Sequence, residues 1–213
     1  MKVTFTYSKE KDIWCLTRYG KSSNNSSSPT KEYSRLTAFT GENPSNDMVS
    51  YFIDKHVIEN KISTALSIST YQHKWDIVAD RYQEIAEGIF GVTIKDDVTA
   101  YITINSRCPY SIEQNSFFVS VPTYSAVKTA MHELWHFYTW YKFGITWEEK
   151  IGKQKYNDIK EALTVLLNVE CKDLLPEGII DWGYPQHEAL RKRILELWEE
   201  SENMERVWEE ITK

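Results

Sequence analysis

Residues 130–140 read AMHELWHFYTW and place His132 and His136 four positions apart, with Glu133 directly after the first histidine. On an α-helix, residues four positions apart lie on one face, one turn from each other. Two imidazoles in that arrangement can share one metal ion at ~2.0–2.1 Å, a distance that suits Zn²⁺. The stretch therefore predicts a helix that carries two ligands of a zinc site.

Glu133 has a different place on such a helix. One residue corresponds to a rotation of about 100°, so its carboxylate cannot easily join the coordination sphere of the two histidines. It can instead reach a water molecule on the metal, whose pKa zinc lowers towards ~7, and take its proton as a general base. The pattern H-E-x-x-H thus combines a Lewis acid, a nucleophile and a base.

The residues around the motif favour a buried helix. Those within and beside it are large and apolar: Met131, Leu134, Trp135 and Phe137. A carboxylate and two imidazoles in a buried helix need partners, because burying an unpaired charge is costly. A metal ion meets that need, whereas the alternative is a solvated stripe that carries two histidines and a surface glutamate.

The apolar patterns along the chain predict a single α+β domain. Alternating apolar residues and turn signals indicate strands, which we expect at 2–8, 12–20, 31–39, 98–104 and 116–122. Apolar residues at helical spacing indicate helices, which we expect at 46–65, 70–89, 125–143, 157–171 and 186–213. The Ser/Asn tract at 22–30 is expected to be a mobile loop within the sheet. The domain would then have a β-rich and helical upper part, 1–122, and a helical lower part, 123–213.

The composition argues against several classes of protein. The net charge is −6 and the Lys and Arg residues are scattered, so a nucleic-acid partner is not expected. No run approaches the ~18 apolar residues of a membrane span, and the N-terminus lacks the apolar core of a signal peptide. The three cysteines are far apart, which argues against a disulfide framework. We therefore expect a cytoplasmic protein with no membrane partner.

At its H-E-x-x-H residues the chain resembles the zincin metallopeptidases. In that family a small sheet with a backing helix and an edge strand precedes the active-site helix, and the substrate adds to the edge strand in extended form. The resemblance implies the same fold here, with a backing helix at 70–89 and an edge strand at 116–122. A peptide or protein substrate would bind antiparallel to that strand.

A catalytic zinc needs three protein ligands and an open position. The metzincin branch of the family continues with H-x-x-G-x-x-H, but this chain has Thr139 and Lys142 where Gly and His are required. The resemblance is therefore to the gluzincins, which take a glutamate from a following helix. Glu161, which lies 25 residues after His136, is the candidate for this third ligand.

Two interpretations of Glu161 stay open in the sequence. With Thr164 and Asn168 it forms a polar stripe on an apolar helix, and that stripe would face something polar inside the protein. In the competing interpretation, Asp158 and Glu161 form a capping box at the start of the helix. The remaining candidates for the third ligand are Asp158, Glu170, Asp173 and His187.

A peptidase also needs a group that stabilises the oxyanion. The gluzincin resemblance implies a His or Tyr from a later segment, and the stretch GYPQHEAL offers Tyr184 and His187 as further catalytic residues. The alternative is that Tyr184 is a core residue and that His187 caps the last helix.

The residues and the resemblance together predict a zinc metallopeptidase, similar to the minimal single-domain gluzincins. A second hypothesis comes from another class. The chain would then be a regulatory or toxin-like module with a zincin fold, acting mainly by partner binding and with weak or single-target cleavage. A cytoplasmic location favours narrow specificity, because a general peptidase would damage its host.

Overall fold

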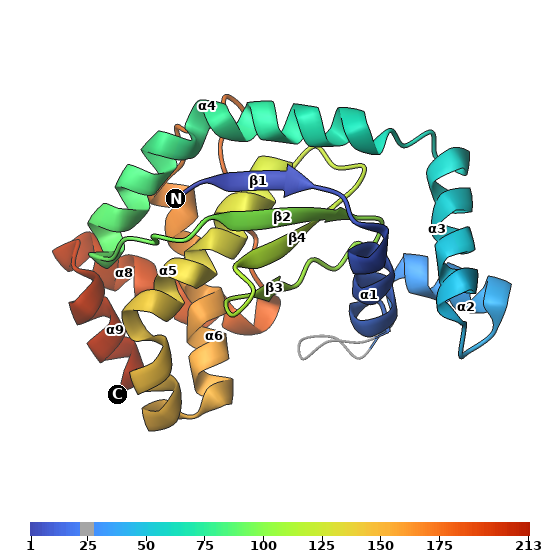
Figure 1. Cartoon of the computed structure of the whole chain (residues 1–213). Helices are drawn as coiled ribbons and strands as arrows, with labels where there is room; N and C mark the ends of the chain where they lie inside the picture. The colour runs from blue at the N-terminus through green and yellow to red at the C-terminus, as the bar shows by residue number, and fades with distance from the viewer. Residues whose placement is uncertain (22–27) are drawn as a thin grey trace. The chain divides into compact units, whose positions relative to one another are not determined.

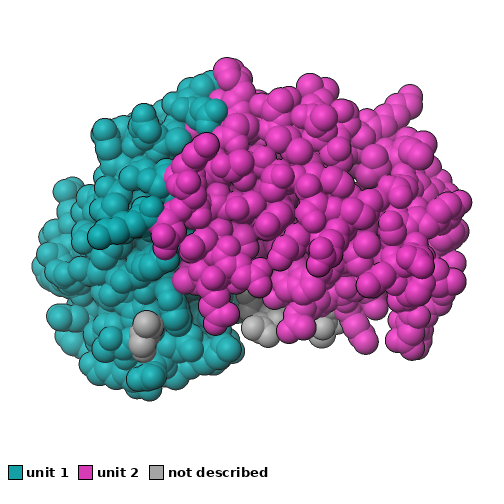
Figure 2. Space-filling view, in the orientation of Figure 1, with its two compact units in different colours: residues 1, 76–95, 131–213 teal, residues 2–75, 96–130 magenta. Residues whose placement is uncertain are grey.

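The computed structural model describes residues 1–21 and 28–213, and it confirms the α+β class (Figure 1). The chain divides into two compact units, coloured separately in Figure 2. The sheet unit comprises residues 2–75 and 96–130, and the helical unit comprises Met1, 76–95 and 131–213. Two of the unit boundaries fall within long helices. That the chain acts as one catalytic domain stays a prediction.

The sheet has four strands in the order β1-β2-β4-β3. The strands β1 (Val3–Thr6), β2 (Val98–Thr103) and β4 (Ser116–Ser120) are parallel to one another, and β3 (Tyr110–Ser111) is antiparallel to β4. Buried residues alternate along β1, whereas β4 is buried over four consecutive residues. Alternating burial is typical of an edge strand, and continuous burial is typical of an interior strand. The predicted strands at 98–104 and 116–122 are confirmed as β2 and β4.

β4 is nevertheless not the edge strand that the family resemblance implied. Phe117 pairs with Ala100 of β2 on one side and with Tyr110 of β3 on the other. Its backbone groups are therefore engaged by two neighbours, and the prediction of an edge strand at 116–122 is wrong. A substrate could not add to β4 along the residues that β3 already covers.

The strand predicted at 12–20 is also wrong, because residues 12–19 lie in a helix. The helix α1 (Lys9–Tyr19) begins after Ser8, whose side chain caps the first turn by accepting a backbone N–H. Its buried residues Asp12, Cys15 and Leu16 are three and four positions apart, which is the spacing of one helical face. The cap outweighs the alternating apolar residues that suggested a strand.

The predicted third strand is likewise a helix, α2 (Lys31–Thr40). Thr30 caps it by accepting the backbone N–H of Tyr33, and Leu36 is its buried residue. The following helix, α3 (Asn46–Glu59), was expected and is capped by Ser45 in the same way. The first 122 residues are thus far more helical than predicted. Most of the Ser/Asn tract expected to form a loop, at 22–27, lies outside the described residues.

The helix α4 (Thr64–Phe90) confirms the helix expected at 70–89. Within the sheet unit, Gln72 of α4 uses its side-chain amide as a substitute for a neighbouring strand. Its Oε1 accepts the backbone N–H of Phe5 at 2.9 Å, and its Nε2 donates to the carbonyl of Val3 at 3.0 Å. Free backbone groups at the edge of β1 are therefore satisfied by a helix side chain.

The remaining helices lie in the helical unit, apart from the first five residues of α5 (Ala126–Ile151). The others are α6 (Lys153–Leu163), the 3₁₀ turn η1 (Thr164–Leu166), α7 (Leu167–Glu170), the 3₁₀ turn η2 (Pro185–His187), α8 (Glu188–Ser201) and α9 (Met204–Thr212). α5 runs past Gly144, where an end was predicted. The indole of Trp140 lies across this glycine, so that a Cβ there would be 2.3 Å from the ring, and the missing side chain serves packing rather than termination. The predicted last helix is divided at Glu202, whose φ is 46°, and Asn203 caps α9. No helix in the described ranges has both the length and the apolar run that a membrane crossing requires.

Aromatic side chains form the core of the helical unit. Phe90 of α4 contacts the ring of Trp135 at 5.0 Å between centroids, and Phe143 stacks on Trp208 of α9 at 4.0 Å. The Tyr82 hydroxyl donates to the carbonyl of Met131 at 2.8 Å. Because these contacts lie on the apolar face of α5, they fix which of its faces is left for the histidines.

Asp12 is a fully buried carboxyl in the sheet unit. Its Oδ1 accepts hydrogen bonds from the Thr103 hydroxyl at 2.6 Å and from the Ile104 N–H at 3.1 Å. Its Oδ2 is buried with no hydrogen-bond partner among the described residues. Burial disfavours the charged form more than these hydrogen bonds and the nearby Tyr7 and Lys9 favour it, and it raises the pKa of Asp12 to about 6.

We expect this carboxyl to make stability fall as pH rises. The folded chain holds the Asp12 proton more tightly than the unfolded chain, whose pKa is the ordinary 3.8. The Asp12 contribution to the free energy of unfolding should therefore decrease between about pH 4 and pH 6, by on the order of 3 kcal/mol at most. In urea unfolding with chelator present, the difference in stability between the wild type and Asp12→Asn should shift against the wild type by this amount over that pH range. Equal slopes of stability against pH in both proteins would refute the assignment.

Candidate metal centre

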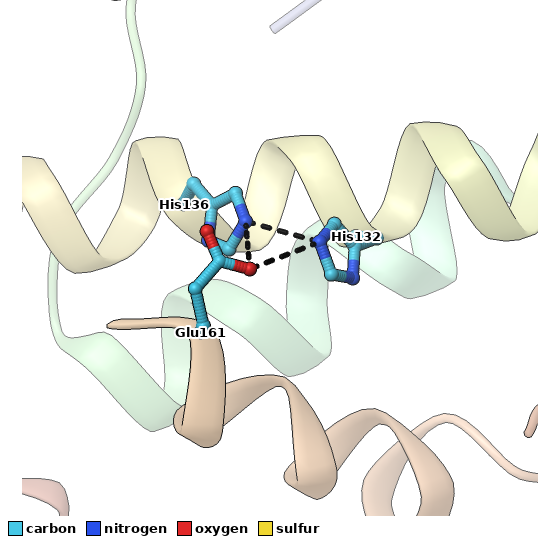
Figure 3. Close-up of side chains that lie close together, drawn as sticks. All are labelled: His132, His136 and Glu161. Carbon is cyan, nitrogen blue, oxygen red and sulfur yellow. Dashed lines mark hydrogen bonds and ion pairs between the residues drawn. The ribbon is translucent and has the colours of Figure 1, made fainter. Parts of the chain in front are cut away.

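Three possible metal ligands converge in the helical unit (Figure 3). His132 and His136 lie on one face of α5, with their Nε2 atoms 3.0 Å apart. Glu161, on α6, places Oε2 at 3.7 Å from the Nε2 of His132 and 3.5 Å from the Nε2 of His136. Two helices thus bring together the three side chains that the sequence pattern selected.

The spacing of these atoms suits a zinc ion. Two ligands bound at ~2.0–2.1 Å in a tetrahedral arrangement lie about 3.3 Å apart. The three separations of 3.0, 3.5 and 3.7 Å lie on both sides of that value. Two imidazoles and one carboxylate are also a donor set that zinc accepts in sites with an open fourth position.

The capping-box interpretation of Glu161 is wrong. α6 begins at Lys153, with Gly152 at its N-cap and no side-chain cap, so Asp158 lies inside the helix. Asp158 instead accepts a hydrogen bond from the Gln154 side chain at 2.9 Å. Glu161 is therefore free of any role at the helix start, and its side chain points to the histidines (Figure 3).

The polar stripe that starts at Glu161 meets Asp181. The Thr164 hydroxyl donates to the Asp181 Oδ1 at 2.8 Å, and Asn168 makes two hydrogen bonds to the Asp181 backbone, at 2.6 and 3.0 Å. The other carboxylate oxygen, Oδ2, lies 2.6 Å from the Nδ1 of His132. A carboxylate on Nδ1 orients the ring so that Nε2 faces a metal, and it increases the basicity of the ligand.

Arg191, on α8, holds Asp181 from the other side. Its Nη1 donates to the Asp181 Oδ1 at 3.0 Å and to the Thr164 hydroxyl at 3.0 Å, and its Nη2 donates to the Asp181 carbonyl. The guanidinium packs so tightly on the backbone that a Cβ at Gly183 would be 2.6 Å from Nη1. Gly183 also has a φ of 60°, so both the close approach and the backbone conformation require glycine here.

Sequence reasoning missed Asp181 and Arg191. Asp181 lies in a segment without regular structure, 45 residues after His136, where no periodicity reports which way a side chain points. One signal was present, because Asp181 is the only acidic residue between Glu177 and Glu188 and is flanked by large apolar residues.

The two histidines have opposite protonation preferences. Burial lowers the pKa of His132, but its hydrogen bond to Asp181 and the nearby carboxylate of Glu161 outweigh burial and raise it to about 10. For His136 burial dominates and lowers the pKa to about 4. Burial also opposes ionisation of Glu161, yet the histidines and Lys160 hold its pKa well below its ordinary value. Before a metal binds, His132 therefore carries a proton and His136 does not.

Glu133 is not one of the three converging donors, as its position in the motif predicted. Its side chain is 7% exposed, and burial raises its pKa to about 8. His132 and Lys160 act in the opposite direction, and Glu161 adds to the rise. A carboxyl whose pKa lies near neutrality can both take up and return a proton, which is what a general base in catalysis must do.

Tyr184 and His187 lie together but outside the donor group. Their rings meet edge to face at 5.7 Å, and the His187 Nε2 lies 3.1 Å from the Asp158 Oδ1. His187 is buried, and its Nδ1 has no hydrogen-bond partner within the described chain, whereas Tyr184 is 38% exposed. Asp158, the partner of His187, precedes Glu161 by three residues on α6. Tyr184 and His187 therefore lie about one helical turn from the donors. A role for either residue in stabilising an oxyanion stays a prediction.

The remaining candidates for the third ligand have other surroundings. Glu170 accepts a hydrogen bond from the Trp198 indole at 2.7 Å, and Asp173 is exposed. Among the described residues, the group that could hold a metal consists of His132, His136 and Glu161.

We expect zinc affinity to rise with pH. The lone pair of the His132 Nε2 becomes available only when the ring loses its proton, so the dissociation constant should fall about tenfold per pH unit from pH 6 to pH 8. Asp181→Asn removes the charge that holds the proton on His132, so the dissociation constant of this variant should depend less steeply on pH. Competition with a chromophoric chelator measures the zinc dissociation constant of both proteins across this pH range. A dissociation constant independent of pH in the wild type would contradict the protonation of His132.

We also expect Gly183→Ala to weaken zinc binding through Arg191. Gly178→Ala is the matched control, because Gly178 has a similar φ of 72° but its Cβ would meet its nearest neighbour only at 4.0 Å. Both variants should lose about 1 kcal/mol of stability from backbone strain. Only Gly183→Ala should also lose zinc affinity, by roughly tenfold. Equal affinities in the two variants would show that Arg191 does not support the centre.

Compared with protein-family models, with curated proteins and with solved structures, the chain matches none. A function can therefore be inferred only from the residues of the centre itself.

Proposed function

We propose that this protein is a zinc-dependent metallopeptidase of gluzincin-like type. The observation that carries the proposal is the convergence of His132, His136 and Glu161, whose donor atoms all lie within 4.8 Å of one another. Glu133 follows the first of these histidines directly and is held in a buried position. The three donors would bind the ion, and Glu133 would be the base.

Different side chains of the protein have different roles in peptide hydrolysis. A bound zinc ion supplies Lewis acidity, which acidifies water and polarises a carbonyl. Glu133 takes the proton from the attacking water and returns it to the leaving amine, as its raised pKa favours. Asp181 keeps the Nδ1 of His132 occupied, so that only Nε2 is available as a donor.

The order of elements along the chain supports a zincin-like fold for this site. The long helix α4 comes first, then the strands β2 and β4, then α5 with the motif, and finally a helical part that contributes Glu161. This is the order that the resemblance implied, apart from the edge strand. The substrate would be an extended peptide or protein segment, and its sequence preference is open.

The test combines metal analysis with an assay of peptide cleavage. We expect one zinc per chain in the wild type and in Glu133→Gln. Turnover of a peptide library should fall by at least about 100-fold in Glu133→Gln, because that variant lacks the base. Glu161→Gln should lose zinc affinity by more than about tenfold, since a neutral amide is a much weaker ligand.

The controls separate this proposal from the competing class. Asp173→Asn, an exposed acid in the same unit, should change neither zinc content nor turnover. Zinc at one per chain with no cleavage of any peptide would favour a module that acts by partner binding. A chain that binds no zinc would refute the proposed function altogether.

A further inference from the structure

A buried lysine lies beside the candidate ligand Glu161. Lys160 is the preceding residue of α6 and is only 6% exposed, although lysine is almost never buried without a partner. Its Nζ lies 3.3 Å from the Glu161 Oε1. Its charge also reaches the neighbouring groups, because it lowers the pKa of both Glu133 and His136.

The two oxygens of Glu161 therefore have different environments. Oε2 faces the Nε2 atoms of His132 and His136, at 3.7 and 3.5 Å, whereas Oε1 faces the ammonium of Lys160. The carboxylate as a whole is 11% exposed, so water does little to satisfy Oε1. Without Lys160, this oxygen would be a buried acceptor with an unsatisfied charge.

The difference matters because a carboxylate can bind a metal through one oxygen or through both. Binding through both would occupy a further position on the ion. A catalytic zinc site needs an open position for water or substrate, in addition to its three protein ligands. Some feature of the protein must therefore keep the second oxygen away from the ion.

We infer that Lys160 is a positioning residue that binds Oε1 of Glu161 and thereby makes Glu161 a ligand through Oε2 alone. This inference rests on the proposed function, because it assumes that the three donors hold a metal. It goes beyond that proposal by giving a task to a residue outside the motif and outside the ligand set. The task is to keep the open coordination position open.

The inference predicts an unusual combination of effects for Lys160→Met. Removing a buried cation next to a dication relieves repulsion, and the released Oε1 gains the ion as its partner. Zinc affinity should therefore stay equal to that of the wild type or increase. Turnover of a cleavable peptide should fall by roughly 10- to 100-fold, because the position for water is taken. A merely structural role for Lys160 would lower affinity and turnover together.

The experiment uses the full chain loaded with Co²⁺, whose visible absorption reports the coordination number. The wild type should show the intense bands of a four-coordinate ion, and Lys160→Met should show the weaker bands of a five-coordinate one. Lys160→Gln, which is neutral but polar, is a second variant in case the first fails to fold. Lys153→Met, an exposed lysine on the same helix, is the matched control and should resemble the wild type.

The outcomes separate this inference from the proposed function. If the wild type binds Co²⁺ with four-coordinate bands and both Lys160 variants give the same bands, Lys160 has no such role and the metal site stands. A five-coordinate wild type, or a loss of metal affinity in folded Lys160 variants, would also overturn the inference. If the wild type binds neither Co²⁺ nor Zn²⁺, the proposed function itself fails.

Discussion

The hydrogen bond between the His132 Nδ1 and Asp181 connects the candidate metal centre to the rest of the helical unit. At 2.6 Å it fixes the plane of the ring, and with it the direction of the Nε2 that faces His136 and Glu161. Asp181 lies in a segment without regular structure, so it needs support of its own. That support comes from Thr164 of η1, Asn168 of α7 and Arg191 of α8. One ring orientation thus depends on several segments that are far apart in the sequence.

The charges of the centre explain why its protonation is unusual. Three carboxylates, Glu133, Glu161 and Asp181, lie with two cations, Lys160 and Arg191, in surroundings that exclude most water. One negative charge is left over, and burying it uncompensated is costly. Before a metal binds, the proton that the raised pKa keeps on His132 compensates this charge, while the raised pKa of Glu133 comes first from its own burial. Protons and a metal ion bound at this centre would therefore compete for the same stabilisation.

How much of the centre the sequence reveals depends on how local each contact is. His132, Glu133 and His136 were found because helical periodicity alone determines their relative placement. Glu161 needed a second argument, the polar stripe on an apolar helix, and that stripe does meet a polar partner. The supporting residues were not found, because their role comes from contacts between segments distant in sequence, for which a single sequence carries no periodic signal.

The fold shows the same dependence on local signals. The helices α3 and α4 and the strands β2 and β4 were predicted from apolar spacing, and their positions were correct to within several residues. α1 and α2 were mistaken for strands because short apolar runs fit both periods. In each case the cap decides, with Ser8 and Thr30 satisfying the first backbone N–H groups. Cap residues next to acidic first turns were therefore better evidence than apolar alternation over nine residues.

The C-terminal helices are part of the centre's structure rather than an appendage to it. α8 supplies Arg191, and α9 packs Trp208 against Phe143, about two turns beyond His136 on α5. The helix that carries the motif is consequently held at one end of its apolar face by α9, while the ring of His132 is held through Asp181 by α8. Because rigid surroundings are what keep ligand atoms at a fixed separation, the geometry of the three donors is a property of the packed helical unit. In the proposed function, His132, Glu133 and His136 supply the chemistry, but they do not by themselves supply the precision that this chemistry needs.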